Sequence, residues 1–229
     1  MERVKTGIPG LDELMGGGMP RNQLMLLTGT AGTGKTTLCS QFVFQGFKRH
    51  QENGVYLTFE EPPEYIKENM KEFGWDFASL EKTGKFSYIK YDPYRSDDVI
   101  EILESGIREN EAKRVVIDSV SALGLHIRDP EELRRMIFSL SIMLRRLKCS
   151  AIMVSEIPPG SQGLSRYGVE EFVSDSVVVL YYERIQGTFN RLLQVWKLRG
   201  SNHSDKLHPY TIGKDGIRVN PMEEGFLRE

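Results

Sequence analysis

Two patterns of apolar and polar residues alternate along the first two thirds of the chain. Short apolar runs, which are typical of buried strands, are separated by longer segments in which apolar residues recur every three or four positions, as in amphipathic helices. The strand-like runs are Leu24–Thr28, Val55–Phe59, Phe86–Tyr91, Val115–Asp118 and Ala151–Ser155. Strands that alternate with helices predict an α/β fold in which a mostly parallel sheet is flanked by helices.

The segments between these runs carry the end signals of helices. A glycine-rich turn precedes Thr36–His50, and Pro-Glu at the start of Pro63–Phe73 suits a first helical turn. Ser96 is expected to cap a third helix, and Asp129 stands before Pro130 at the start of a fourth. The pattern therefore predicts one helix after each of the first four strand-like runs.

The last third of the chain changes to strand-like segments with short links. These segments are Val177–Tyr182, Leu192–Leu198, Pro209–Ile212 and Ile217–Val219. The turn signals Gln186-Gly187 and Asp215-Gly216 lie between them, so the sheet is predicted to end in C-terminal antiparallel hairpins. Since no stretch rich in Pro, Gly or Ser divides the chain, we expect a single domain over residues 1–229, in which segment 1–23 leads into the first strand.

Composition and charge exclude several classes of protein. The chain has 30 Lys and Arg residues against 32 Asp and Glu residues, and a net charge of −2 does not favour a general electrostatic grip on nucleic acid. The two cysteines, Cys39 and Cys149, form no CxxC pair and fit a reducing compartment. No apolar run approaches the ~20 residues that span a bilayer, and no apolar signal-peptide region follows Met1. We expect a cytoplasmic protein without a membrane span.

The strongest chemical signal follows the first strand-like run and matches the P-loop pattern GxxxxGK[ST]. Its glycines let backbone N–H groups surround phosphate oxygens, and the start of the next helix adds partial positive charge. Lys35 is expected to reach the β- and γ-phosphates, and the Thr36 hydroxyl to bind Mg²⁺. The predicted nucleotide-binding residues here are Gly29, Thr30, Ala31, Gly32, Thr33, Gly34, Lys35, Thr36 and Thr37.

Carboxylates end three of the other strand-like runs or follow them directly. Asp118 is expected to hold Mg²⁺ directly or through water, although many strands end in Asp and the expectation depends on the P-loop. Glu60 and Glu61 would orient the attacking water if their strand lies next to the P-loop strand, and a solvated loop is the equal alternative. Glu156 is a rival or a helper, and Ser155 beside it is a candidate sensor of the γ-phosphate.

Four further motifs accompany the P-loop. They are TGIPGLDEL at 6–14 with GGGMP at 16–20, FEE at 59–61, RYGVEEF at 166–172 and WKLRGSNH at 196–203. Together they resemble the KaiC-like branch of the RecA/RadA superfamily of P-loop ATPases, over about residues 3–220. FEE is similar to the catalytic glutamate pair of that branch, and WKLRGSNH to its Lys-x-Arg-Gly segment. Ala31 stands where many relatives have proline.

The resemblance implies a RecA-like core that assembles as a homo-oligomer, usually a hexameric ring, with ATP between neighbouring copies. Glu60 and Glu61 would then activate water, while Lys197 and Arg199 would reach the γ-phosphate bound by the neighbour. Without the resemblance, Lys197 and Arg199 are alternating residues on one face of a strand. The alternative is a solvent-facing strand edge whose charges deter aggregation. Clock members of the branch carry two such domains in tandem, whereas the resemblance covers this chain once, so a clock role is not predicted. No protein partner is indicated.

Three functions remain open at this stage. The first is an ATPase that hydrolyses Mg·ATP for signalling or remodelling, and the second is a nucleotide-gated assembly module with little hydrolysis. The third is a recombination accessory protein on single-stranded DNA. Autokinase activity has no local support, because nothing marks Ser161, Ser165 or Ser174 as a phosphate acceptor.

Two features bear on nucleic-acid binding, which is possible but not favoured. One predicted helix carries the basic residues Arg134, Arg135, Arg145, Arg146 and Lys148. Because the protein is acidic overall, a solvated helix face or a subunit contact is preferred over a DNA contact. Segment 157–173 is comparable to a DNA-contacting loop of recombinases. It holds two glutamates beside a single arginine and a single tyrosine, and is a poor match for a single-strand groove.

Overall fold

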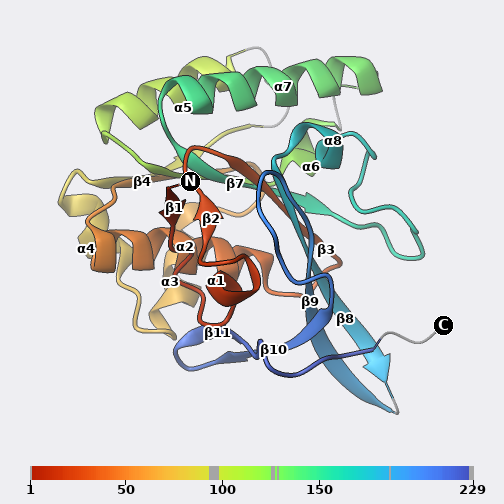
Figure 1. Ribbon diagram of the computed structural model, residues 1–229. Coiled ribbons are helices and arrows are strands. Elements are labelled where there is room, and N and C mark those ends of the chain that lie inside the picture. The colour runs from red at the N-terminus through yellow and green to blue at the C-terminus, as the bar shows by residue number, and fades with distance from the viewer. Residues whose placement is uncertain (1, 93–97, 125–126, 128, 186, 227–229) are drawn as a thin grey trace.

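A nine-stranded sheet forms the centre of the protein (Figure 1). The structure is a computed structural model that describes residues 2–92, 98–124, 127, 129–185 and 187–226. The large sheet has the order β11-β10-β9-β8-β3-β7-β6-β4-β5, and β1 and β2 form a separate antiparallel pair. Among the described residues, no helix combines the length and the apolar composition that crossing a membrane requires.

The strands are β1 (Arg3–Val4), β2 (Met19–Pro20), β3 (Leu24–Gly29), β4 (Gly54–Thr58), β5 (Phe86–Lys90), β6 (Arg114–Asp118), β7 (Ser150–Glu156), β8 (Ser176–Ile185), β9 (Thr188–Leu198), β10 (Leu207–Gly213) and β11 (Gly216–Val219). The helices are α1 (Leu11–Leu14), α2 (Lys35–His50), α3 (Pro63–Lys71), α4 (Phe77–Lys82), α5 (Val99–Glu109), α6 (Val120–Leu123), α7 (Pro130–Arg146) and α8 (Glu170–Val173).

The sheet has a parallel half and an antiparallel half, as the sequence predicts. β8, β3, β7, β6, β4 and β5 pair in parallel, with Leu24 opposite Ala151 at the start of β3 and Gly29 opposite Glu156 at its end. β8–β9, β9–β10 and β10–β11 are antiparallel. The predicted α/β class with a mostly parallel sheet and C-terminal hairpins is confirmed.

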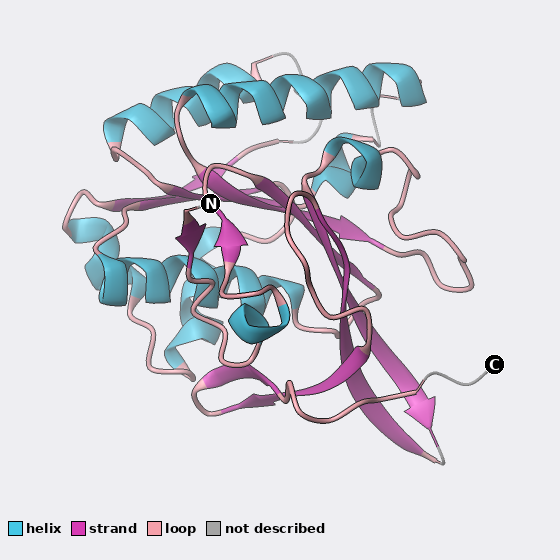
Figure 2. Cartoon of the chain, in the orientation of Figure 1, coloured by secondary structure: helices cyan, strands magenta, loops and turns pink. Residues whose placement is uncertain are grey.

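Helices cover both faces of the sheet (Figures 1 and 2). On one face α2, α3 and α4 enclose a core that includes Phe42 and Phe77, and the N-terminal segment joins this side through Leu11. On the other face α5 and α7 bury Leu103 and Ile137 against the alternate residues of the same strands. Strands buried on both faces explain why their sequences are continuous apolar runs with no alternation.

The element boundaries differ from the sequence predictions in a few places. Helix α4 was not predicted, although Asp76 marks its start by accepting a hydrogen bond from the Ser79 backbone N–H at 3.0 Å. Helix α7 begins after Asp129 as predicted, and the Asp129 carboxylate caps it by accepting a hydrogen bond from the Glu131 N–H at 3.0 Å. Ser96 lies outside the described residues. The strand before Glu60 and Glu61 is not adjacent to the P-loop strand, because β7 and β6 separate β4 from β3.

Arg114, at the start of β6, joins three parts of the fold. Its fully buried guanidinium donates to the Phe42 carbonyl of α2 and to the Lys5 carbonyl, each at 2.8 Å, and to Glu52 Oε2 at 2.7 Å. The guanidinium also lies 4.5 Å from the centre of the Phe42 ring. Gly46 leaves room for it, since a Cβ there would lie 2.1 Å from Arg114 Nε. The N-terminal segment is thereby held against the helix that begins at the P-loop.

Arg114→Ala is expected to lower the free energy of unfolding by about 3–5 kcal/mol, because it leaves the Phe42 and Lys5 carbonyls without their donor and removes one of the two arginines that pair with the partly buried Glu52. Urea denaturation measures the change. Arg108→Ala removes an exposed pair with Glu104 on α5 and serves as the control, for which a loss of about 0.5 kcal/mol or less is expected. Equal losses in the two variants would contradict the role given to Arg114.

Candidate functional site

The P-loop connects the end of β3 to the start of α2. Gly32 and Gly34 have φ angles of 78° and 87°, in the left-handed region that glycine adopts without strain. A Cβ on Gly34 would also lie 2.6 Å from Ile212 Cδ1 of β10, so the loop has no room for a side chain there. These constraints turn the chain so that the first N–H groups of α2 face a pocket of about 200 Å³.

Lys35 lies at the edge of this pocket with its side chain over the loop. Its Nζ donates to the Gly29 and Thr30 carbonyls at 3.0 and 2.8 Å. Burial lowers the pKa of the Lys35 ammonium, while Glu156 and Asp118 oppose the shift. A partly desolvated cation beside inward-facing N–H groups is well placed to bind phosphate oxygens.

Asp118, at the end of β6, lies opposite the P-loop as predicted. Its Oδ2 accepts hydrogen bonds from the Thr36 hydroxyl at 3.0 Å and from the Tyr56 hydroxyl at 2.6 Å. Burial raises the pKa of the Asp118 carboxyl, whereas the two hydrogen bonds and Lys35 act against that rise. A buried carboxylate next to a threonine hydroxyl is a set of hard oxygen donors, which is the chemistry that Mg²⁺ requires.

Three glutamates line the same pocket, although β4 is not adjacent to β3. Glu60 and Glu61 follow β4, and Glu156 ends β7. Partial burial raises the pKa of Glu60, and Glu156 and Asp118 raise it further; burial and Asp118 raise that of Glu61. The loop after β4 reaches back over the ends of β6 and β7, and Phe59 N–H donates to the Asp118 carbonyl at 2.9 Å. Both glutamates thus line the P-loop pocket, with Glu60 exposed and Glu61 half-buried.

Ser155 does not face the pocket, so its expected role as a γ-phosphate sensor is not supported. Its buried hydroxyl donates to Glu170 Oε1 at 2.9 Å and accepts from the Arg166 backbone N–H at 3.2 Å. Glu170 is fully buried and also accepts from the Ser165 hydroxyl at 2.7 Å. This network fixes segment 157–173 to β7. It also occupies Ser165, which leaves that serine poorly placed to accept phosphate.

Tyr56 is the site residue that the sequence analysis missed. It lies inside the apolar run of β4, where its ring packs 5.2 Å from that of Tyr88, and its hydroxyl reaches Asp118 across the β4–β6 pair. The available signal was a hydroxyl-bearing residue within a strand buried on both faces, since such a group needs a partner when it is buried.

Lys197 and Arg199 lie at the end of the strands opposite to the P-loop. Leu198 pairs with Ser176, and Ser176 pairs with Met25 near the start of β3, whereas the P-loop follows the end of β3. A six-residue strand separates the two ends, which corresponds to roughly 17 Å. These two side chains cannot meet the P-loop of their own chain without a large rearrangement.

Backbone carbonyls around α8 hold the two cations in place. Lys197 Nζ donates to the Glu171 and Ser174 carbonyls, each at 2.7 Å, and Arg199 donates to the Phe172 carbonyl at 2.9 Å. Burial, and next the charge of Arg199, lower the pKa of Lys197. Two large apolar side chains are exposed beside Arg199 and line a groove with it: Phe172 is 60% exposed and Phe138 of α7 is 56% exposed. Exposed aromatic residues beside cations are typical of protein interfaces.

The arginines of α7 do not form one free basic stripe. Arg145 pairs with Asp175, and Arg146 pairs with Glu104 of α5. Arg134, Arg135 and Arg145 line a groove of about 650 Å³ together with Phe138, Phe172 and Arg199, and Arg135 also lies 3.9 Å from Asp129. A groove with exposed aromatic residues and several ion-paired arginines resembles a protein contact more than a DNA contact.

Comparison with known proteins gives consistent findings. A model of the family described as "ATPase: KaiC" matches residues 4–224. The UPF0273 protein MJ1359 of Methanocaldococcus jannaschii is 40% identical, and the match covers 100% of both chains. The circadian clock oscillator protein KaiC of Picosynechococcus sp. is 37% identical over 97% of this chain and 45% of that protein. The crystal structure of the KaiC-like protein PH0186 from Pyrococcus horikoshii has a TM-score of 0.88 at 37% identity, covering 96% of this chain and 99% of the other.

Proposed function

Because the chain belongs to the KaiC family of ATPases, we propose that it hydrolyses Mg·ATP at sites completed between neighbouring copies of itself. Family membership and the similarity to the KaiC-like structure give it an ATP-binding ATPase domain with a RecA-like fold. The observation that supports hydrolysis is one pocket in which Lys35 and Thr36 face Asp118, Glu60 and Glu61.

Phosphate binding falls to the P-loop and the start of α2. The backbone N–H groups of residues 32–37 surround the β- and γ-phosphates, and Lys35 exchanges its carbonyl partners for phosphate oxygens. Thr36 and Asp118 would hold Mg²⁺, since their oxygens are 3.0 Å apart and both are hard donors. Magnesium bound there supplies positive charge to the β- and γ-phosphate oxygens.

Water activation falls to Glu60 and Glu61. A carboxylate with a raised pKa is a stronger base, and it removes a proton from the attacking water more readily than an ordinary exposed glutamate does. We assign the main role to Glu61. Its backbone carbonyl accepts from the Thr58 hydroxyl at 2.8 Å, which fixes this residue at the end of β4, whereas Glu60 is more exposed.

We assign the stabilisation of the charge on the transferring phosphoryl group to a second copy of the chain. Lys197 and Arg199 lie at the end of the sheet that points away from their own P-loop, and we propose that they reach the γ-phosphate held by a neighbouring copy. Cations delivered in trans stabilise the charge of the transferring phosphoryl group. This division supports a closed homo-oligomer in which every copy donates its cations to one neighbour and receives those of another. The family resemblance gives six copies.

We also propose that residues 1–229 act as one domain, because both cores pack on one sheet.

Phosphate release per chain, measured over a wide range of protein concentration, tests this function. The specific rate is expected to rise with concentration and then level off, because a lone copy lacks the cations of its neighbour. ATP binding without phosphate release at any concentration would contradict hydrolysis and favour the nucleotide-gated assembly module.

The DNA alternative has weaker support, since the hydroxyl of Tyr167 in segment 157–173 donates a hydrogen bond to the Ser121 carbonyl at 2.8 Å.

Tyr56→Phe is expected to raise the Mg²⁺ concentration needed for half-maximal phosphate release by about tenfold or more, because the residues behind a metal ligand typically contribute that much to metal affinity. The substitution removes the Tyr56 hydroxyl, which donates the shorter of the two hydrogen bonds to Asp118 Oδ2. The readout is a magnesium titration at saturating ATP, together with magnesium-dependent tightening of nucleotide binding at equilibrium.

Tyr88→Phe is the matched control for this substitution. It removes the same atom from the ring that packs against Tyr56 but leaves the bonds to Asp118 intact. The magnesium titration of this control is expected to match that of the unmodified protein. An unchanged titration in Tyr56→Phe would show that the hydroxyl does not position Asp118.

A further inference from the structure

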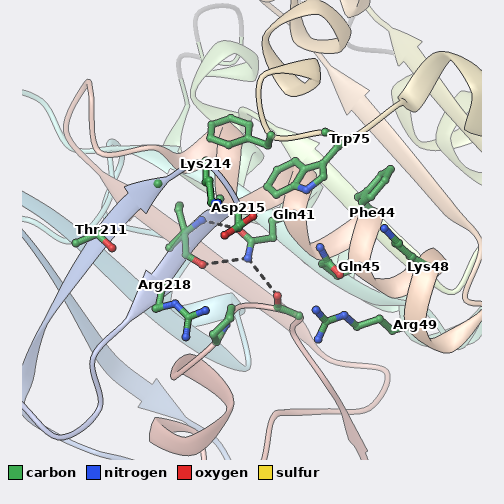
Figure 3. A pocket seen from close by; sticks show the side chains of 17 residues that line it. Gln41, Phe44, Gln45, Lys48, Arg49, Trp75, Thr211, Lys214, Asp215 and Arg218 are labelled. Carbon is green, nitrogen blue, oxygen red and sulfur yellow. Dashed lines mark hydrogen bonds between the residues drawn. The ribbon is translucent and has the colours of Figure 1, made fainter.

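A second pocket lies on the α2 side of the sheet, apart from the P-loop pocket (Figure 3). It has a volume of about 460 Å³, within the range of small-molecule sites. Its walls come from the N-terminal segment at Gly7 and Pro9, the second half of α2, residues 73–75 after α3, and the β10–β11 hairpin. It shares no lining residue with the P-loop pocket among the residues that the structure describes.

Cationic side chains outnumber carboxylates in the lining of this second pocket, although the chain as a whole has a net charge of −2. Lys48 and Arg49 come from the last turn of α2, and Lys214 and Arg218 come from the β10–β11 hairpin; Asp215 is the one carboxylate in the described lining. No ion pair joins any of these four cations to a carboxylate in the part of the chain that the structure describes. In Figure 3 the Arg49 and Arg218 side chains extend from opposite sides of the view toward its centre.

Rigid groups form the base of the pocket. Gln41 Nε2 donates to the Gly7 and Ile217 carbonyls at 3.1 and 3.0 Å, and its Oε1 accepts from the Ile217 N–H at 2.7 Å, as the dashed lines in Figure 3 mark in part. Trp75 stacks on Phe44 and on Phe73, with ring centres 5.9 and 4.9 Å apart. The four wall segments are thereby fixed together, so the backbones that carry the cations are held in place before any ligand binds.

Gln45 adds a buried polar group with an unpaired oxygen beside this pocket. It lines the pocket one turn from Gln41, only 9% of its surface is exposed, and its buried Oε1 has no hydrogen-bond partner among the described residues. Buried amide oxygens are normally paired, and an unpaired one costs free energy.

We propose that this pocket is a second anion site that binds a small molecule carrying a pyrophosphate group. The two walls carry four cations, and a single monovalent anion would neutralise the charge of only one of them. Two linked phosphates carry more negative charge and offer oxygen acceptors to both walls at once. Arginine forks match phosphate oxygens in pairs, and Arg49 and Arg218 stand on different walls. The proposal goes beyond ATP hydrolysis, because the ligand bound here is a different molecule from the nucleotide at the P-loop.

Calorimetric titration of inorganic pyrophosphate tests the site, with the full chain carrying Lys35→Ala to weaken phosphate binding at the P-loop. In magnesium-free buffer of low ionic strength, this protein is expected to bind one pyrophosphate per chain, with an affinity that falls as salt is added. Adding Arg49→Gln and Arg218→Gln is expected to weaken binding at least tenfold, and so is the separate pair Lys48→Gln and Lys214→Gln.

Lys85→Gln with Lys113→Gln removes two exposed positive charges outside the pocket and is the matched control, for which unchanged binding is expected. Circular dichroism verifies that each variant is folded. Absence of pyrophosphate binding in the Lys35→Ala protein would overturn the proposal, as would an equal loss in the control. Weaker ATP binding in the pocket variants, with no pyrophosphate binding in the Lys35→Ala protein, would assign the pocket to the nucleotide at the P-loop instead.

Discussion

Glu61→Gln is expected to lower kcat for ATP hydrolysis by about 10²–10⁴-fold, the range that a general base contributes. Glutamine keeps the size and the hydrogen-bonding shape of the side chain but cannot take a proton from water. ATP binding is expected to be unchanged, because Glu61 lies across the pocket from the P-loop and bonds none of its residues. Steady-state phosphate release and equilibrium binding of ATP measure the two effects separately.

Glu64→Gln on α3 is the control, since this exposed carboxylate lies outside the lining of the P-loop pocket and is expected to leave kcat unchanged. Glu60→Gln is expected to have a smaller effect than Glu61→Gln, and the double substitution to exceed either one. If Glu60→Gln alone abolished turnover while Glu61→Gln did not, the order of the two roles would be reversed.

The pH dependence of kcat follows from the same pair of carboxylates. Burial and neighbouring carboxylates raise the pKa of both Glu60 and Glu61. A base is inactive when protonated, so activity is lost as the pH falls through the raised pKa, and the acid limb is expected above the ordinary glutamate pKa of about 4.3. A matching acid limb in Glu61→Gln, at its lower rate, would show that another group causes it.

Arg199→Ala is expected to lower kcat by about 10³-fold or more, which is the lower end of what a cation supplied in trans contributes to phosphoryl transfer. The affinity of the variant's P-loop for ATP is expected to change little, because Arg199 lies at the opposite end of the strands from that P-loop. The side chain is 52% exposed and its removal leaves the Lys197 contacts in place, so the fold is expected to persist.

Lys206→Ala removes an exposed cation that pairs with Glu224 and serves as the control for this substitution. Its rate is expected to equal that of the unmodified chain. A normal rate in Arg199→Ala would remove the argument that the site is shared between copies, and Lys197 would then be tested in the same manner.

Much of this fold was accessible from the sequence, for physical reasons that differ between elements. Strands such as Val115–Asp118 are buried on both faces, so they appear as continuous apolar runs, and the P-loop glycines are required by positive φ angles at Gly32 and Gly34. Local signals such as Asp129 before Pro130 depend only on neighbouring residues. The P-loop, Asp118 and the glutamates were thus predicted together, and the structure places them around one pocket.

The parts that the sequence did not provide depend on distant contacts. Strand order is one of them, because nothing within Gly54–Thr58 states that β6 and β7 lie between it and the P-loop strand. The Tyr56 hydroxyl is another, since its partner Asp118 is 62 positions away along the chain. Ser155 was misjudged for a related reason: Glu170, which binds its hydroxyl, belongs to a later segment whose return to β7 has no local signature.

Mixing two inactive variants tests the central claim that ATP sites are completed between copies. Lys35→Ala removes the P-loop cation but leaves Lys197 and Arg199 intact, whereas Arg199→Ala does the reverse. Subunits mixed and reassembled with ATP are expected to regain a substantial fraction of the unmodified phosphate-release rate, because some interfaces then join an intact P-loop to an intact Arg199. Mixed assemblies verified by native mass spectrometry that release phosphate no faster than the separate variants combined would contradict the shared site.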